Sequence, residues 1–416
     1  MPNAAAMPNV SRRTIDDPAA EAARLLARLS IMLLFIISQL APILTRQTIY
    51  ILLPIGAALL LLSASLAPET RRLREIAVLA LTPTAFAAFF FVGWTGLSLA
   101  WTPFGAGPAE RFAKSVATLA LVAAACALLP ARTKTSNLNL LPIGTAAAAA
   151  ALAAVALVSA GGGGQPVDLD SNALQRAGLG LALAIWPALG ALALRGRWVS
   201  AAVVALVSGA ACLLARAPNA LPALIVGALV LALSFGKARR AGSLLAIAAA
   251  GVILLAPLAP ILMHLAAPER LPAFAAPLET WGRIIASDGP RLFIGHGFGA
   301  AVFGVAGHYL YPDTPRSLLF QVWFDLGILG AFGLAAVVAR AFYVIGRTRP
   351  VLAPFLLGGL ATGLTICVLG PAAEQLWWLT LAGLDAIAFA LVLKGQFRTR
   401  RPRVEPNWGM GRIVVR

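Results

Sequence analysis

The sequence predicts an all-α fold, a polytopic integral membrane protein with about twelve transmembrane helices. Of its residues, 60% are hydrophobic and 12% are charged, whereas soluble domains carry roughly 25% charged residues. The long apolar runs are rich in Ala and Leu and lack the period-two alternation of membrane-spanning strands. Because a backbone in lipid must satisfy its own hydrogen bonds, these runs are expected to cross the membrane as helices.

The apolar runs divide the chain into three regions. Residues 1–28 are polar and lack the small-residue cleavage site of a signal peptide, so they are expected to form a cytoplasmic N-terminal segment. Residues 29–393 are expected to form the transmembrane domain, and residues 394–416 a basic cytoplasmic tail. Spans are expected at 29–45, 48–67, 76–100, 115–130, 140–160, 173–194, 198–215, 219–235, 241–263, 317–343, 351–370 and 376–393.

Lys and Arg residues at the ends of the apolar runs predict the orientation. If the N-terminus lies inside, every dense basic cluster falls on the same side, as is typical of cytoplasmic loops. These clusters contain Arg12, Arg13, Arg24, Arg28, Arg71, Arg72, Arg74, Arg132, Lys134, Arg195, Arg197, Lys237, Arg239, Arg240, Arg347 and Arg349. The net charge of +17 therefore indicates contact with membrane lipids, and no nucleic acid partner is expected.

Several classes of site are disfavoured by what the sequence lacks. Cys126, Cys212 and Cys367 lie in apolar runs without metal-ligand spacing, which favours small buried hydrophobic residues. With three histidines and no Cys/His cluster, neither a metal nor another cofactor is expected. No P-loop, Rossmann fingerprint or inverted repeat is visible, and the spans read as free of charge, which disfavours a transporter.

The face opposite the basic clusters holds the longest connection, 264–316, between spans 9 and 10. Connections of this length between helices are usually functional. Its basic residues run against the positive-inside tendency, which indicates an anionic ligand. A shorter loop on the same face, 101–114, carries Glu110, Arg111 and Lys114.

Four stretches in a fixed order resemble one family of bacterial envelope enzymes. They are 170–173 (Asp-Ser-Asn-Ala), 213–220 with Ala215 where Ser is usual, Trp281 followed by 290–299, and 317–330. Together they are similar to the O-antigen ligase and polymerase superfamily over roughly residues 80–395. Two positions depart from the pattern. The usual His-Asn pair falls on Arg316-Ser317, and the usual loop arginine before Trp281 is missing.

The resemblance implies a glycosyltransferase of the bacterial inner membrane with its active face in the periplasm. It would transfer a glycan from undecaprenyl diphosphate to an acceptor such as lipid A-core or another glycan. Arginines would meet the charge of the diphosphate leaving group, because the guanidinium holds phosphate bidentately and stays charged. A His or a carboxylate would accept the proton of the acceptor hydroxyl, and no metal is required.

Arg216, at the outer end of the seventh span, is the first diphosphate ligand that the resemblance implies. The alternative is an arginine that snorkels to the head groups. Further diphosphate ligands are expected among Arg283, Arg270, Arg291 and Arg316, although a solvated, salt-bridged loop would look the same.

The base is expected to be His308, eight residues before the family's usual position, with Asp313 as its replacement. An ordinary loop histidine is the alternative. Asn172 and Glu374 are further candidates. His296 is expected to bond its own backbone, and Gly295, Gly297 and Gly299 to form tight turns. Interfacial anchors are expected at Trp281, Trp323, Trp377 and Trp378.

Two rivals to the ligase stay open. An O-antigen or polysaccharide polymerase would use a second lipid-linked glycan as acceptor, and the sequence barely separates the two. A polyprenol-glycan flippase or another transporter belongs to a different class and would place charged residues near the midplane of several spans.

Overall fold

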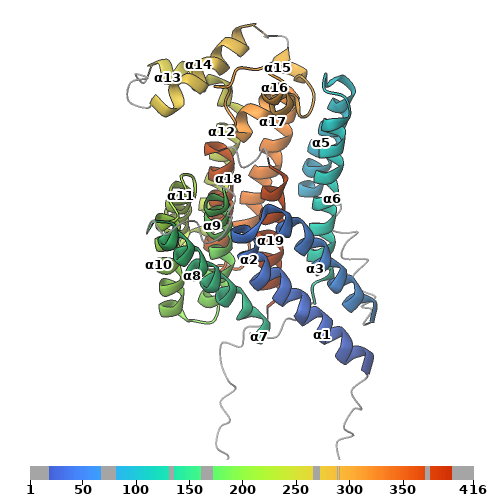
Figure 1. The fold of residues 1–416 in the computed structure, drawn as a ribbon, viewed down its shortest axis with the longest axis vertical. Helices are drawn as coiled ribbons and strands as arrows, with labels where there is room; N and C mark the ends of the chain where they lie inside the picture. The colour runs from blue at the N-terminus through green and yellow to red at the C-terminus, as the bar shows by residue number, and fades with distance from the viewer. Residues whose placement is uncertain are drawn as a thin grey trace, which may run out of the picture.

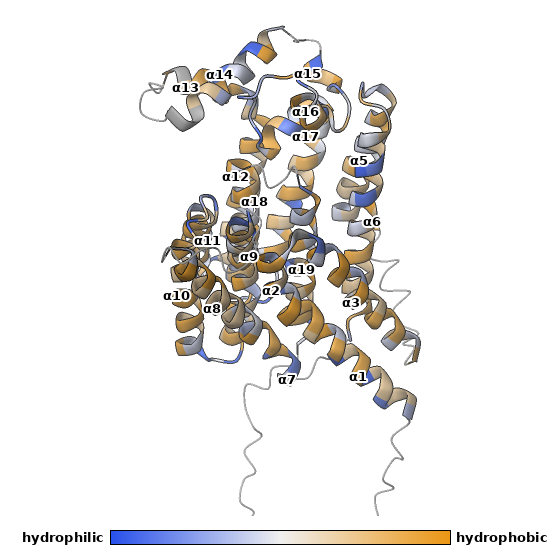
Figure 2. Ribbon diagram, viewed as in Figure 1, coloured by the Kyte–Doolittle hydropathy of each residue, from blue (hydrophilic) through white to orange (hydrophobic). Residues whose placement is uncertain are grey.

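The structure, a computed structural model, describes residues 18–66, 81–130, 135–160, 172–265, 272–287, 289, 291–370 and 375–395. Within these ranges every secondary-structure element is a helix, so the all-helical class is confirmed. Hydrophobic residues cover most of the helices, and hydrophilic residues gather at helix ends and connections (Figure 2).

Eight helices are long and apolar enough to cross a membrane, which fits a polytopic membrane protein. One further pair, α12 (Ala238–Leu254) and Ala256–Met263, passes the same test but bends by 57°. Three apolar helices are shorter: α10 (Trp198–Leu214), α11 (Ala220–Ser234) and α18 (Ala353–Leu369). Each expected span overlaps one of these helices or the bent pair, but the count of about twelve crossings stays a prediction.

The first span begins earlier than expected. Helix α1 (Pro18–Met32) continues through a π-helical turn, η1 (Leu33–Ile37), into α2 (Ser38–Leu44), so 18–28 belongs to a helix rather than to a separate polar segment. Ala, Leu, Glu and Arg in this stretch are strong helix formers, which explains the extension. The other long helices are α3 (Arg46–Leu66), α5 (Pro83–Leu97), α6 (Ala106–Leu128), α8 (Leu140–Ala160), α9 (Ala173–Ala193), α17 (Leu318–Ile345) and α19 (Leu376–Leu393).

Helices far apart in sequence pack into one bundle (Figure 1). Helix α9 is buried along most of its length and contacts α2, α8, α10, α18 and α19. The pair α5 and α6 stands at one side, where α5 packs on α17 and α6 on α19. The space between these four helices holds the cavity described below.

The long connection between α12 and α17 is itself helical. It contains η3 (Ala256–Leu258), α13 (Ala259–Leu265), α14 (Pro272–Ser287), α15 (Arg291–Ile294) and α16 (Ala300–Ala306), at one end of the molecule (Figure 1). Helix α14 is amphipathic, which lets it lie over the bundle with one face in solvent. The four tryptophans expected as interfacial anchors, Trp281, Trp323, Trp377 and Trp378, are instead buried in the core.

Candidate functional site

Helix α17 breaks at Gly327, which has φ 65° and ψ −162°. A residue in this conformation cannot continue the helical hydrogen bonds, so the carbonyl groups before it need other partners. Trp94 Nε1 donates to Leu326 O at 2.9 Å. The backbone N–H groups of His296 and Gly297 donate to Phe324 O and Asp325 O, both at 2.9 Å. The segment around 295–299 is thereby fixed to the break.

His296 helps to fix this segment to the break in α17. The sequence predicted that its side chain bonds its own backbone, and the structure shows instead a contact with the backbone of Phe324. Its Nδ1 lies 3.1 Å from Phe324 O, and its ring stacks on the Phe324 ring with centroids 4.0 Å apart. The expected turn glycines are also explained, because Gly295, Gly297 and Gly299 all have positive φ. A Cβ on Gly295 would lie 2.2 Å from Asp325 O, so only glycine permits this close approach.

Asp325 is the buried carboxylate of the region, with 5% of its surface exposed. Its Oδ2 accepts the N–H of Gly299 at 2.9 Å and its Oδ1 accepts the N–H of Ala301 at 2.7 Å. These two N–H groups lie at the start of α16, so Asp325 caps that short helix from a different part of the chain. The N–H groups of the Gly-rich turn therefore have partners within the protein: those of His296 and Gly297 donate to backbone carbonyl groups, that of Phe298 to Ser98 Oγ, and that of Gly299 to the Asp325 carboxylate.

A cavity of about 330 Å³ lies beside Asp325. Its walls come mainly from α5, α6, α17 and α19, with Phe298, Cys367 of α18 and Gln375 completing the lining, and most of the lining side chains are apolar. The polar and charged side chains in the lining are those of Thr95, Arg111, Ser115, Gln321, Asp325 and Gln375. An elongated apolar ligand with an anionic end would match this composition.

Arg111 is the cation of the cavity, and it attracts the Asp325 carboxylate electrostatically. It lies in the first half of α6, whose start follows Gly105, a residue with φ 60°. From the sequence, Arg111 is expected in the loop 101–114 on the same side as 264–316 and is not among the predicted ligands. The missed signal was the helical spacing of Arg111, Ser115 and Leu119, which all line the cavity.

Arg216 lies in the turn between α10 and α11. It is exposed, and it has φ 48°, a left-handed conformation that is uncommon for residues other than glycine. The turn packs on two neighbours: Ala217 lies against Gly178 of α9, and Asn219 lies against Gly370 at the end of α18. Arg216 therefore stands at a helix boundary, as expected from the sequence, and the structure adds that the turn around it is tightly packed.

The remaining described arginine candidates lie elsewhere, at the end of the molecule formed by α14–α17. Arg283 is exposed and its Nη2 donates to Glu279 Oε1 at 2.6 Å. This hydrogen bond and the charge of Glu279 raise the pKa of Arg283. Arg291 and Arg316 are exposed too, and Arg291 borders a small hollow with Trp281 and His296. Figure 1 shows α14 and α15, which carry Arg283 and Arg291, well separated from the α10–α11 turn, so these two arginines and Arg216 do not form one cluster.

His308 directly follows α16 and its C-cap Gly307, and it is exposed with φ 61°. Asp313 is exposed in the connection to α17. Ser317, at the position of the family's Asn, caps α17 by accepting the N–H of Phe320. Asn172 stands at the N-cap of α9. Arg270 and Glu374 lie outside the described residues.

The spans are not free of charge, contrary to the expectation from sequence. Arg176 in α9 is buried, with 3% of its surface exposed, and Asp325 and Asp385 lie in α17 and α19. These residues face other helices, and ionisable side chains within membrane spans are tolerated in such positions because they avoid contact with lipid. Arg176 lies two residues before Gly178, which contacts the Arg216 turn, and it is a second polar residue that was not predicted from the sequence.

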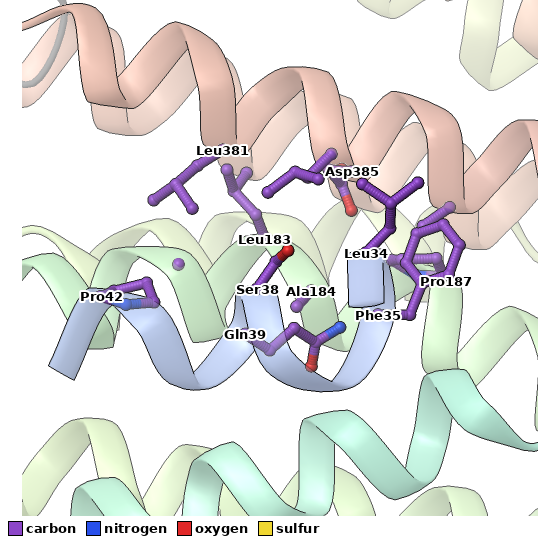
Figure 3. Close-up of a pocket in the computed structure, with 13 residues that line it drawn as sticks. Leu34, Phe35, Ser38, Gln39, Pro42, Leu183, Ala184, Pro187, Leu381 and Asp385 are labelled. Carbon is purple, nitrogen blue, oxygen red and sulfur yellow. The ribbon is translucent and has the colours of Figure 1, made fainter. Parts of the chain in front are cut away.

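A second, smaller cavity of about 30 Å³ lies between α2, α9 and α19 (Figure 3). Ser38, Gln39 and Asp385 line it together with apolar residues, and its volume suits a single water molecule. Asp385 Oδ1 and Gln39 Oε1 are buried without a hydrogen-bond partner among the described residues. The π-helical turn η1 adjoins it, and such turns are frequent at functional sites.

Comparison with known proteins adds no family to these observations. No protein-family model matches the chain, and no curated protein matches it either. Within the described ranges, no group of three or more His, Cys, Asp or Glu side chains is arranged to hold a metal ion.

Proposed function

We propose that the chain is an O-antigen ligase-like glycosyltransferase of the bacterial inner membrane, with about twelve spans and its active face in the periplasm. It transfers a glycan from undecaprenyl diphosphate to lipid A-core or another glycan acceptor. The main observation behind the proposal is the cavity between α5, α6, α17 and α19, whose lining is mostly apolar and includes the cationic side chain of Arg111. The ordered motifs of the sequence support the same reading.

The cavity suits a lipid carrier because its two kinds of lining match the two parts of such a ligand. Apolar side chains from all four helices would contact the polyprenyl chain, and Arg111 would contact the diphosphate. Gln321 and Gln375 supply further amide donors at the same cavity.

In the proposed reaction the acceptor hydroxyl attacks the anomeric carbon of the donor glycan. The bond from that carbon to the diphosphate oxygen breaks, and undecaprenyl diphosphate leaves. The hydroxyl proton passes to His308 or, failing it, to Asp313, both exposed in the segment over the bundle. Arg111 and Arg216 are the cations proposed to offset the charge that develops on the leaving group.

The test is transfer activity of Arg111 variants in a strain that lacks the chromosomal gene. Arg111→Ala is expected to reduce glycan attachment roughly 100-fold, the scale of losing one stabilising cation or donor. Arg111→Lys is expected to retain part of the glycan attachment, because the lysine ammonium keeps the positive charge but cannot form the paired hydrogen bonds of a guanidinium to phosphate. Lys114→Ala is the matched control, since Lys114 is exposed on the same helix and pairs with Glu110.

Membrane levels of each variant are measured by immunoblot, so that a loss of transfer is separated from a loss of protein. Full attachment by Arg111→Ala at normal protein level would remove the cavity from the proposal. Deletion of the gene separates the ligase from the polymerase: loss of all attached chains indicates a ligase, and a single attached repeat indicates a polymerase.

A transporter is the second candidate, and Asp385 is the observation that favours it. A carboxyl group within a span, beside a water-sized cavity, is a common feature of ion-coupled transport. Purified protein in vesicles that moves a polyprenol-linked glycan across the bilayer, without forming a glycosidic bond, would replace the transferase proposal.

A further inference from the structure

Two basic turns meet at the end of the molecule opposite the α13–α16 segment. One joins α11 to α12, and the other joins α17 to α18. Helices α12 and α17 pack closely where they approach these turns, because a Cβ on Gly242 would lie 2.8 Å from Gly346 Cα and 2.7 Å from Phe342 O. At the other end of the pair, Trp323 Nε1 donates to Ile253 O. The close glycine contact therefore fixes the two turns side by side.

The two turns enclose an open cavity of about 720 Å³. Its lining contains four cationic side chains, Lys237, Arg239, Arg240 and Arg347, and no Asp or Glu among the described residues that form it. All four side chains are exposed. Four cations around one concave surface create a positive potential, which attracts anions to the site.

Arg347 is held in place within this cavity. Its Nη1 donates to Tyr343 O at 2.9 Å, and its guanidinium carbon lies 3.3 Å from the centre of the Tyr343 ring. Stacking and a backbone hydrogen bond limit the side-chain freedom that binding would otherwise remove. Helix α12 begins at Ala238 in the lining, and its N-terminal dipole adds a further partial positive charge.

Aromatic residues adjoin the cationic site at the ends of α10 and α11. Phe235 directly precedes the lining residue Gly236, and it contacts Trp198 with ring centroids 6.4 Å apart. Trp198 is 51% exposed and Phe235 is 47% exposed. Exposed aromatic rings beside cations at the ends of spans are typical of the head-group level of a bilayer. A small soluble anion would not contact these rings, whereas a lipid would contact them with its acyl chains.

We propose that this cavity binds an anionic phospholipid whose head group carries two phosphodiesters. Lys237, Arg239, Arg240 and Arg347 contact the phosphates, and Trp198 and Phe235 contact the acyl chains. Four cations match two phosphates better than one, and basic pockets between membrane helices suit such head groups. The proposal does not depend on the transferase activity, because the site lies at the opposite end from the segment proposed to carry the base.

The test is native mass spectrometry of the purified full-length protein in detergent, titrated with cardiolipin, phosphatidylglycerol or phosphatidylethanolamine. Cardiolipin is expected to bind at concentrations at least 10-fold lower than phosphatidylglycerol, and phosphatidylethanolamine not to saturate. Arg239→Ala/Arg240→Ala is expected to weaken cardiolipin binding roughly 30-fold, about fivefold for each cation removed near an anionic surface. Arg239→Lys/Arg240→Lys keeps both charges and is expected to bind within a fewfold of the unaltered protein.

Arg197→Ala is the matched control, because Arg197 is exposed at the neighbouring α9–α10 turn and does not line the cavity. Equal binding of cardiolipin and phosphatidylethanolamine, or an equal loss in the Arg197 variant, would overturn the proposal. Inorganic pyrophosphate supplies the last arm. If it binds the lipid-free protein as tightly as cardiolipin does, and with the same loss in the double alanine variant, the ligand is a free phosphate rather than a lipid.

Discussion

The carboxylate of Asp325 accepts the backbone N–H of Gly299 at 2.9 Å, across 26 residues of sequence. The same side chain accepts the N–H of Ala301, so one buried carboxylate joins the broken helix α17 to the turn that precedes α16. Asp325→Ala would leave both buried N–H groups without an acceptor, at a cost of about 3–5 kcal/mol. We expect the melting temperature of the detergent-purified protein to fall by at least about 5 °C.

The melting temperature of Asp325→Asn is expected to lie between those of the Ala variant and the unaltered protein. The amide oxygen of Asn accepts only one of the two N–H groups, and its NH₂ group faces the other. Asp313→Ala, an exposed carboxylate in the same half of the chain, is the control and should leave the melting temperature unchanged. Equal melting of the Ala variant and the unaltered protein would show that the turn does not need Asp325.

Gly327→Ala should prevent accumulation of folded protein. At φ 65° and ψ −162° the backbone occupies a region that is essentially restricted to glycine, and a Cβ there would lie 2.5 Å from Phe293 O. Fluorescence-detected gel filtration of a tagged variant measures the loss as a reduced monodisperse peak. Gly251→Ala is the comparison, since Gly251 lies within helix α12 with open space around its Cβ position; alanine there should be neutral or slightly stabilising.

The break at Gly327 also shows how far sequence reasoning reaches. The apolar runs predicted where helices lie, because burial in lipid depends only on local composition. The run 317–343 continues through Gly327 without interruption, so nothing local marks the break. Its cause is the segment around His296 and Gly297, some thirty residues upstream, which supplies the N–H donors. Contacts at that separation follow from the packed fold and not from a pattern.

The candidate site likewise contains one residue that the sequence indicated and one that only the fold reveals. The resemblance directed attention to Arg216, and the positive φ found there is consistent with a special position. It could not reveal Arg111, because the cavity forms only when α5 and α6 pack against α17 and α19. The prediction that the four tryptophans are interfacial anchors was wrong for a related reason. A tryptophan near the end of a span is expected at the membrane interface unless its packing partners are known, and Phe320, the partner of Trp281, is evident only in the fold.

Arg216→Ala is expected to abolish glycan attachment while the protein still inserts, because the variant removes a cation proposed to bind the diphosphate. Arg216→Gly separates side chain from backbone. It lacks the cation as well, but it adopts φ 48° without strain and should be more stable than the Ala variant by about 1 kcal/mol. Surface glycan on a gel and membrane protein by immunoblot are the two readouts. Normal smooth lipopolysaccharide from both variants would favour the snorkelling arginine.

His308 is best tested by Asn rather than by Ala. Its φ of 61° lies in the left-handed region, where Asn is tolerated and Ala is strained, so His308→Asn removes the imidazole with the least change to the backbone. Transfer by the purified variant is expected to fall at least 100-fold, the scale of losing a general base. Asp313→Asn, in the same connection, should retain most of its transfer activity. If the two results are reversed, the carboxylate of Asp313 accepts the acceptor proton and His308 is an ordinary exposed residue after α16.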